Sequence, residues 1–486
     1  MPAPFFTQNE SEITRLEGLY VMERTPPADI IGVSLNDVCV MGESIRGPVG
    51  RAVLCSSPAR IREVFGGRDQ GSGGVVTSPL WRALLNKPFS RLWIVRAAAA
   101  AAVKATVTMS VVRTDATSVG QWGNNISAEV KAASDGDANH FNLEVTYLGS
   151  TKVYKNLNVY AGADNLLSVI GSDDANWITL TKLADGRPVN GVYPLTTGAD
   201  GIIADSDFTG VGKAIDIAAA VQNVGCVFIA ERSSAALKAA IETKAASTPD
   251  RMWLIGPDSE TVTAAAAITD VDNYRDTAGR MVYTYGHTYT LDPETASEIL
   301  THPESWLASI FSQTDVDIHV GEEDTKRFTA GIIRLYNESF VRGDYIAFKD
   351  AGICALEKDA GGFAFVSGVT TSLTPGFEQI ARRRCADYLL LSLAKDLRFQ
   401  VKKKNTPTRR AIISGLIDGF INSHKRAERI VLDYELLKDG AAGNTDLTRA
   451  QGIERFRIRV QLIPHLLYLV IEGEIGTNVI ITDKAA

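Results

Sequence analysis

The most regular hydrophobic periods lie in the last quarter of the chain. Thr406 and Pro407 suit the cap and first turn of a helix, and the apolar residues that follow recur at three- and four-residue spacing. These residues, with one histidine among them, are Ile413, Leu416, Ile417, Phe420, Ile421 and His424. A similar period from Phe377 to Leu389 predicts another helix. Strict alternation in 455–462 predicts a strand with Phe456, Ile458, Val460 and Leu462 on its covered face.

Apolar strands and capped helices alternate in two other parts of the chain. Each of two Ser-Pro pairs, at Ser57 and Ser78, offers a cap followed by a proline at the first helical position. The apolar strand candidates are 33–42, 89–96, 226–230 and 252–255. This alternation is typical of an α/β domain with buried strands.

Short β-rich segments interrupt that alternation after the alanine-rich run 97–103. The segments 106–112, 126–132, 141–147 and 152–159 are separated by Gly, Asn and Asp turns, which predicts an inserted all-β domain. Further on, 292–323 shows no period and is predicted to be irregular, whereas 331–365 shows strand patterns. The glycine-rich stretch 66–74 is predicted to be a flexible surface loop.

These patterns predict a mixed, multidomain α+β protein with extended arms at both ends. The two terminal strand candidates are short and need partners from elsewhere: Leu19, Tyr20, Val21 and Met22 near the start, and Val479, Ile480, Ile481 and Thr482 near the end. The predicted parts are an N-terminal arm (1–20), an α/β middle domain (21–96 and 199–350), the inserted β domain (97–198), a C-terminal core domain (351–475) and a C-terminal arm (476–486).

Charge is distributed unevenly along this chain. The segment 376–486 holds 19 Lys and Arg against 13 Asp and Glu, which is a net charge of +6. Because the net charge of the whole chain is −7, the other 375 residues have a net charge of −13. Such asymmetry indicates a basic module with an acidic partner, although a solvated helix face would give the same pattern. The pI near 5.6 argues against a general nucleic-acid-binding protein.

The motif search predicts no catalytic, cofactor or metal site. Five scattered cysteines form no CxxC pair, and the histidines never occur at ligand spacing. Gly210–Ala214 resembles half a phosphate loop but lacks its first glycine and its Ser or Thr. Asp135, Asp137 and Asn139 match an incomplete calcium loop, for which a turn is the favoured interpretation. The longest apolar run, 97–103, is too short for a membrane span, which predicts a soluble protein. The scattered cysteines fit synthesis in a reducing cytoplasm.

Several of these stretches resemble the sheath proteins of contractile phage tails and related contractile injection systems. The resemblance rests, in order, on GLYVMER (18–24), VMGESIRGPV (40–49), VFGG (64–67), LWIVR (92–96), QWGNNI (121–126), LTTGADG (195–201) and the C-terminal basic block. Each motif is common by itself, but their order and spacing along nearly the whole chain are specific.

The resemblance implies a structural subunit without an active site. Such subunits form stacked six-membered rings around an inner tube and contract to drive the tube through a cell envelope. The implied partners are other copies, the inner tube, and baseplate and terminator proteins, in a virion tail assembled in the host cytoplasm. Arms would donate strands to neighbours by β-augmentation. The residues that we expect to face the tube are Arg409, Arg410, Lys425 and Arg426.

Two other classes of function are compatible with parts of the sequence. A hydrolase-like enzyme could be built on an α/β domain with a β accessory domain, but no nucleophile, base and oxyanion motif is found. A nucleic-acid-binding protein could use the basic block, yet Tyr388, Phe399 and Phe420 are its only aromatics between 382 and 429 and occupy core-like positions. We therefore expect no membrane insertion and no direct nucleic-acid binding.

Overall fold

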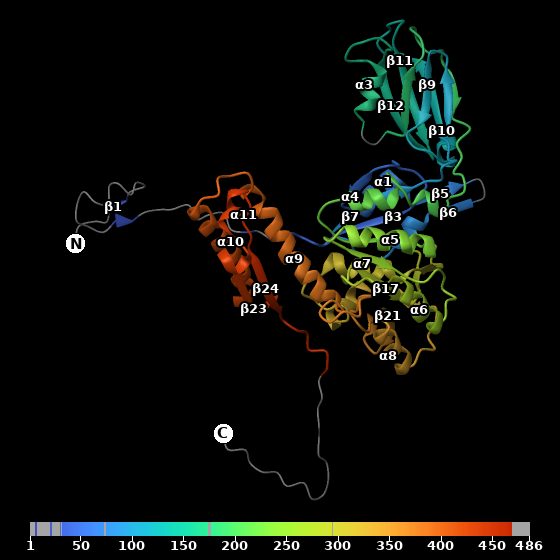
Figure 1. Ribbon diagram of the computed structural model, residues 1–486. Coiled ribbons are helices and arrows are strands. Elements are labelled where there is room, and N and C mark those ends of the chain that lie inside the picture. Colours follow the sequence, from blue (N-terminus) through green and yellow to red (C-terminus); the bar gives the residue numbers. More distant parts are fainter. Residues whose placement is uncertain are drawn as a thin grey trace, which may run out of the picture. The chain divides into compact units, whose positions relative to one another are not determined.

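The computed structural model describes residues 5–6, 20–21, 30, 32–71, 74–173, 176–293 and 295–468. The chain divides into two compact units (Figure 1). The large unit comprises 30–401, and the small unit comprises 1–29 together with 402–486. Helices and strands occur in both units, so the prediction of a mixed α and β protein is confirmed. The finer domain boundaries given above remain predictions.

An eight-stranded sheet forms the centre of the large unit. Its strands, in spatial order, are β22 (Gly362–Phe365), β21 (Ile353–Asp359), β17 (Met281–Tyr285), β16 (Met252–Ile255), β15 (Val224–Ile229), β3 (Asp37–Glu43), β7 (Arg91–Ala97) and β4 (Ala52–Cys55). The six inner strands are parallel, and the two edge strands, β22 and β4, are antiparallel to their neighbours. Every residue of β15 is buried, as expected of a parallel strand covered on both faces.

Helices cover both faces of this sheet, and alternate residues of β3 show the division. Val38 and Val40 belong to one hydrophobic core, and Cys39 and Met41 belong to the other. The first core includes α1 (Pro58–Phe65), α2 (Pro79–Leu84) and α7 (Pro303–Gln313). The second includes α4 (Ala214–Ala220), α5 (Ala235–Ser247), α6 (Ala264–Val271) and α8 (Arg342–Asp350). The predicted Ser-Pro starts of α1 and α2 are confirmed, because the Ser57 and Ser78 hydroxyls each accept a backbone N–H three residues on.

Helix α7 corrects the prediction that 292–323 is irregular. Every residue from Pro303 to Ser312 is buried, so the helix has no polar face that would produce an amphipathic period. The Trp306 indole donates a hydrogen bond to the Thr288 hydroxyl at 2.8 Å. The strand patterns predicted in 331–365 are present as β20 (Ile332–Leu335), β21 and β22, but the prediction missed helix α8 between β20 and β21. The prediction of a loop at 66–74 is wrong, because this stretch contributes to a hairpin of β5 (Arg68–Gly71) and β6 (Gly74–Thr77).

A β module with its own hydrophobic core lies between β7 and α4 in the sequence. Its core includes Trp122, Phe141 and Leu143, all buried. One of its two sheets has the strand order β12 (Ser150–Leu157), β11 (Phe141–Tyr147), β10 (Ile126–Ala132) and β14 (Gly191–Pro194). The other sheet has the order β13 (Ile178–Lys182), β9 (Val112–Ala116) and β8 (Thr106–Met109). The module also contains helix α3 (Leu166–Gly171). Elsewhere in the large unit, β18 (Thr288–Leu291) lies between β19 (Glu298–Thr301) and β20 (Ile332–Leu335).

The predicted C-terminal helices and alternating strand are present, but they belong to different units. Helix α9 (Ile380–Leu397) lies in the large unit, whereas α10 (Pro407–Arg426), β23 (Val431–Leu437), α11 (Asp446–Ala450) and β24 (Arg457–Leu462) lie in the small unit. The Thr406 hydroxyl caps α10 by accepting the Arg409 backbone N–H. Of the predicted apolar face, Leu416, Ile417, Phe420, Ile421 and His424 are buried.

The terminal arm strands are described only in part. Tyr20 and Val21 form β2 (Tyr20–Val21), which pairs in parallel with β1 (Phe5–Phe6) of the same chain. Leu19 and Met22 lie outside the described residues, as do Val479, Ile480, Ile481 and Thr482. Donation of these strands to another subunit therefore remains a prediction.

Candidate interaction surface of the small unit

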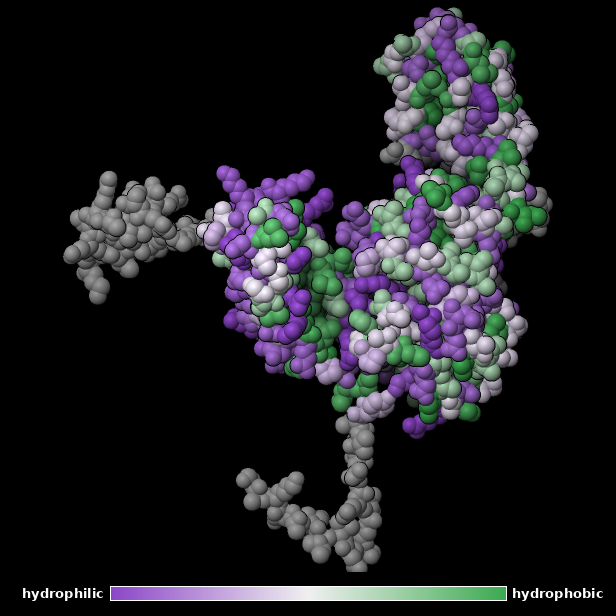
Figure 2. Space-filling model, viewed as in Figure 1, coloured by the Kyte–Doolittle hydropathy of each residue, from purple (hydrophilic) through white to green (hydrophobic). Residues whose placement is uncertain are grey.

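The described C-terminal part of the small unit is strongly basic. Residues 402–468 hold 13 Lys and Arg against 7 Asp and Glu, a net charge of +6. Hydrophilic residues cover much of the visible face of this unit, with apolar residues between them (Figure 2). The exposed apolar side chains include Leu432, Leu447 and Leu466. A surface of this composition fits a macromolecular partner with acidic groups.

The four predicted tube-facing residues lie on α10, in two separate pairs. Arg409 and Arg410 are in the first turn, and Lys425 and Arg426 are in the last. Arg409 and Lys425 are sixteen positions apart, which places them roughly 24 Å apart along the axis and roughly 160° apart around it. The four residues therefore form two basic positions on one helix, not one continuous patch.

Both basic pairs have acidic neighbours inside the small unit. The Lys425 ammonium lies 2.7 Å from a carboxylate oxygen of Asp433, and this contact lowers the pKa of Asp433. The Arg410 guanidinium donates to Asn405 Oδ1 at 3.2 Å and lies 4.0 Å from Glu454. These contacts hold part of the positive charge in place on the surface.

The hairpin of β23 and β24 packs with α10 and carries further arginines. Along β24, Ile458, Val460 and Leu462 are half-buried, whereas Arg457 and Arg459 are exposed, so the predicted alternation is confirmed. Arg459 pairs with Glu435 on the facing strand at 2.9 Å. The exposed arginines thus alternate with half-buried apolar residues along β24, and α10 packs on the neighbouring strand β23.

The arginine run 382–384 makes no such surface, although its sequence suggested one. Arg383 and Arg384 are buried on α9, in the large unit. The Arg384 guanidinium donates to the carbonyl groups of Phe311 and Thr314 at the end of α7. Sequence reasoning counted these residues as surface charge because arginine is rarely buried. Their position among residues of the predicted apolar helix face, such as Ala381 and Cys385, was a sequence signal of this role.

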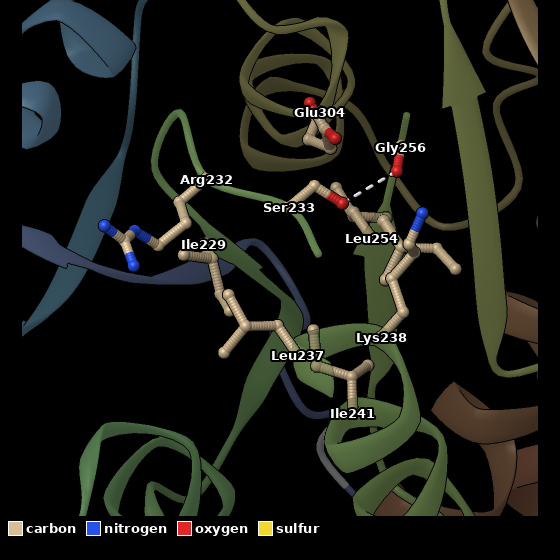
Figure 3. Close-up of a pocket in the computed structure, with 10 residues that line it drawn as sticks. Ile229, Arg232, Ser233, Leu237, Lys238, Ile241, Leu254, Gly256 and Glu304 are labelled. Carbon is tan, nitrogen blue, oxygen red and sulfur yellow. Dashed lines mark hydrogen bonds between the residues drawn. The ribbon is translucent and has the colours of Figure 1, made fainter. Parts of the chain in front are cut away.

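A small hollow lies at the carboxyl ends of β15 and β16, where parallel sheets commonly hold ligands (Figure 3). Its free volume is about 10 Å³, which is the room for a single water. The Ser233 hydroxyl donates to the Gly256 carbonyl at 2.8 Å, and Lys238 is paired with Asp258 at 2.6 Å. Glu304, from α7, lines the hollow, and its Oε2 is buried without a hydrogen-bond partner.

Burial makes Glu304 a source of pH dependence. Desolvation raises its pKa from 4.5 to about 7, so between these pH values the unfolded chain releases a proton that the native state keeps. Stability is therefore lost as the pH rises from 4.5 to 7, by about 3 kcal/mol. We expect Glu304→Gln to remove this loss. The thermal midpoint of the variant minus that of the wild type should therefore be several degrees larger at pH 8 than at pH 5. An equal difference in thermal midpoint at both pH values would contradict this assignment. The control is Glu338→Gln, because the Glu338 side chain is exposed.

The weak ligand motifs have structural roles in the described chain. Asp135 accepts the Asp137 backbone N–H in the turn between β10 and β11 and pairs with His140, as the turn interpretation predicts. Lys213 precedes α4 as its N-cap. Within the residues that the structure describes, no group of three or more His, Cys, Asp or Glu side chains is arranged to hold a metal. None of the helices described there combines the length and apolarity of a membrane span.

Comparison with solved structures shows which class of protein has this fold. The chain is similar to the sheath tail protein of Desulfitobacterium hafniense, with TM-score 0.58 and 14% identity over 87% of this chain and 94% of that one. It is also similar to the sheath tail protein of Listeria innocua, with TM-score 0.61 and 11% identity; this match covers 85% of this chain and 90% of the Listeria chain. The comparison with the contracted helical sheath of the anti-feeding prophage gives TM-score 0.53 and 10% identity, and it covers 95% of this chain and 99% of the prophage chain.

The chain therefore has the fold of contractile tail sheath proteins. The resemblance that the sequence motifs indicated is confirmed at the level of the fold, along most of the chain. No protein-family model and no curated protein matches the sequence. The identities of 10 to 14% show that this fold is kept with a largely different set of side chains.

Proposed function

We propose that this protein is the sheath subunit of a contractile tail or injection system. Its copies form stacked six-membered rings around an inner tube and contract to drive the tube through a target envelope. The observation that carries the proposal is the extent of the fold match, which reaches 95% of this chain and 99% of a chain solved as a contracted helical sheath. The role is structural, with a baseplate and a terminator protein at the two ends of the assembly.

Negative-stain electron microscopy of the purified full chain tests this function directly. A sheath subunit assembles into tubes or stacks of rings as its concentration rises. A protein that stays dispersed at every concentration and salt condition, while folded by circular dichroism, would contradict the proposal. Copurification with a tube protein expressed beside it would identify the second partner.

The arms are proposed to tie neighbouring subunits together by donated strands. Short edge strands such as β2 expose backbone N–H and C=O groups that can pair with another chain. Backbone pairing of this kind can survive rigid-body movement of the subunits during contraction. We expect deletion of 1–20 to abolish tubes while the large unit keeps its thermal transition. Tubes of normal length from the truncated chain would show that the N-terminal arm is not needed.

The basic residues of α10 are proposed to contact an acidic surface of the tube. Because the two pairs lie at opposite ends of the helix, they can be tested separately. We expect Arg409→Glu with Arg410→Glu to reduce tube binding by about tenfold or more and to lower its dependence on salt. The pair Lys425→Glu with Arg426→Glu reports on the other end. The proposal fails for any pair whose reversal leaves tube copurification unchanged.

A further inference from the structure

Two histidine rings face each other where β18 begins and β19 ends. Thr288 and Thr301 form the last pair of the β18–β19 ladder, so the residues just beyond them, His287 and His302, occupy opposed positions. The centroids of the two imidazole rings lie 4.4 Å apart, at an interplanar angle of 73°. Two protonated imidazoles repel each other at this distance, so the packing favours neutral rings.

The Glu304 carboxyl group lies beside the His302 ring. Its Oε2 is 3.8 Å from His302 Nδ1, and its Oε1 lies against Gly256, where an added Cβ would be only 2.1 Å from it (Figure 3). Within the described chain, neither Glu304 Oε2 nor His287 Nε2 has a hydrogen-bond partner, although both atoms are buried. A proton can therefore enter this site without displacing an existing donor. We call His287, His302 and Glu304 the imidazole–carboxyl cluster.

Positive charge from α2 and the residues after it faces this cluster. Burial lowers the pKa of His302 to about 3, and the adjacent His287 ring adds to this shift. Arg82 of α2 and Lys87, which follows α2, lower the pKa of His302 further. Glu231, after β15, accepts a hydrogen bond from Arg82 at 2.6 Å and so neutralises one of these two cations. A proton added to the cluster still faces Lys87.

Two further charged groups act on the cluster, but burial has the larger effect. Burial lowers the pKa of His287 to about 4, and Glu260, after β16, opposes this shift. Burial raises the pKa of Glu304 to about 7, and Lys238 of α5 opposes that rise. The Lys238 ammonium already pairs with Asp258 at 2.6 Å. The site therefore disfavours charged imidazole and charged carboxylate alike.

The number of protons on the cluster decides its charge. With one proton shared between His302 and Glu304, this pair has no net charge, whichever residue holds the proton. A second proton, on either histidine, adds a buried positive charge that the site does not compensate. The histidines therefore stabilise the packed state fully above their ordinary pKa of 6.5, and this stability is lost as the pH falls from 6.5 through 4.

We propose that the imidazole–carboxyl cluster is an acid-sensitive latch, which holds β18 and β19 on the large unit with one proton and releases them with a second. The two histidines flank these strands directly, so their protonation acts on both strands at once. Release is local, because α7 stays packed in the core through Trp306 and Phe311. The latch lies within one subunit, so it goes beyond the proposed sheath function and does not depend on assembly.

Amide hydrogen exchange of the full chain, below its assembly concentration, tests this latch. After correction for the intrinsic exchange rate, peptides covering β18 and β19 should exchange about tenfold or more faster at pH 4.5 than at pH 7. Peptides covering β15 and β16 should keep their protection. An equal rise across the whole chain overturns the inference, because it shows global unfolding, and so does an unchanged rate in β18 and β19.

A double variant, His287→Gln with His302→Asn, replaces both rings by amides that take up no proton in this range. In this variant the exchange of β18 and β19 should be nearly the same at both pH values. The matched control is His140→Asn, in the β module, where the ring pairs with Asp135; it should keep the wild-type rise. A double variant that keeps the rise overturns the inference.

Histidine C2-hydrogen exchange in the wild type provides a second test that needs no variant, because it measures the protonation midpoint of each ring. The midpoints of His287 and His302 should lie below 6.5. That of His140 should lie above 6.5, because its hydrogen bond with Asp135 raises the pKa. Midpoints at or above 6.5 for His287 and His302 overturn the inference, even if the double variant loses its thermal transition. Dispersed wild-type protein without tubes counts only against the proposed sheath function.

Discussion

Replacing Asp387 by alanine is expected to lower the free energy of unfolding of the large unit by about 3–5 kcal/mol, because it leaves two buried cations without their counter-charge. The Asp387 carboxylate accepts hydrogen bonds from Arg280 at 2.9 and 3.0 Å and also pairs with Arg383. All three residues are buried. Burial raises the pKa of Asp387, and the two guanidinium groups oppose that rise.

Chemical denaturation of the full chain measures this loss, followed by the fluorescence of the large unit. Asp272→Ala is the matched control, since Asp272 pairs with Arg275 on the surface with 63% of its side chain exposed. Its removal should cost less than about 1 kcal/mol. If the two variants lost equal stability, the buried arginines would be stabilised by groups other than Asp387.

The second large effect is expected at Arg96, where β7 leaves the sheet for the β module. Its guanidinium donates to the backbone carbonyls of Ser44 at 3.1 Å, Gly47 at 2.9 Å, Ile45 at 3.3 Å and Val119 at 3.0 Å. Burial lowers the pKa of Arg96 to about 10, so the group stays charged near neutral pH. It therefore joins the loop after β3 to the segment between β9 and β10 of the β module.

Arg96→Met keeps most of the side-chain volume but removes every donor. Because each buried carbonyl left unpaired costs about 1–3 kcal/mol, we expect a total loss of at least about 3 kcal/mol. Faster amide exchange in 44–47 and 118–121 should accompany the loss, with the strands of the β module still protected. Arg113→Met removes an exposed ion pair with Asp115 and is the control. Unchanged exchange in both segments would show that Arg96 does not join the two parts.

Local chemistry explains which elements could be predicted. The helix α10 carries its own start signal in Thr406 and Pro407, and one of its faces is apolar because the other faces water. The strand β24 alternates for the same reason. In contrast, α7 is surrounded by protein on all sides, so its sequence has no period to detect. The arginines of α9 looked like surface charge until the structure placed Asp387 and the carbonyls of α7 beside them.

The sequence by itself determined the alternation of α/β and β segments, the capped helices, the basic C-terminal part and, through ordered motifs, the resemblance to sheath proteins. These features depend on neighbours a few residues away, which the chain order specifies. Only the tertiary structure decided which charges are buried, as at Asp387 and Arg383, and which helix, α7, is enclosed by protein on all sides. Those properties depend on contacts between residues far apart in the chain, and no local pattern encodes them.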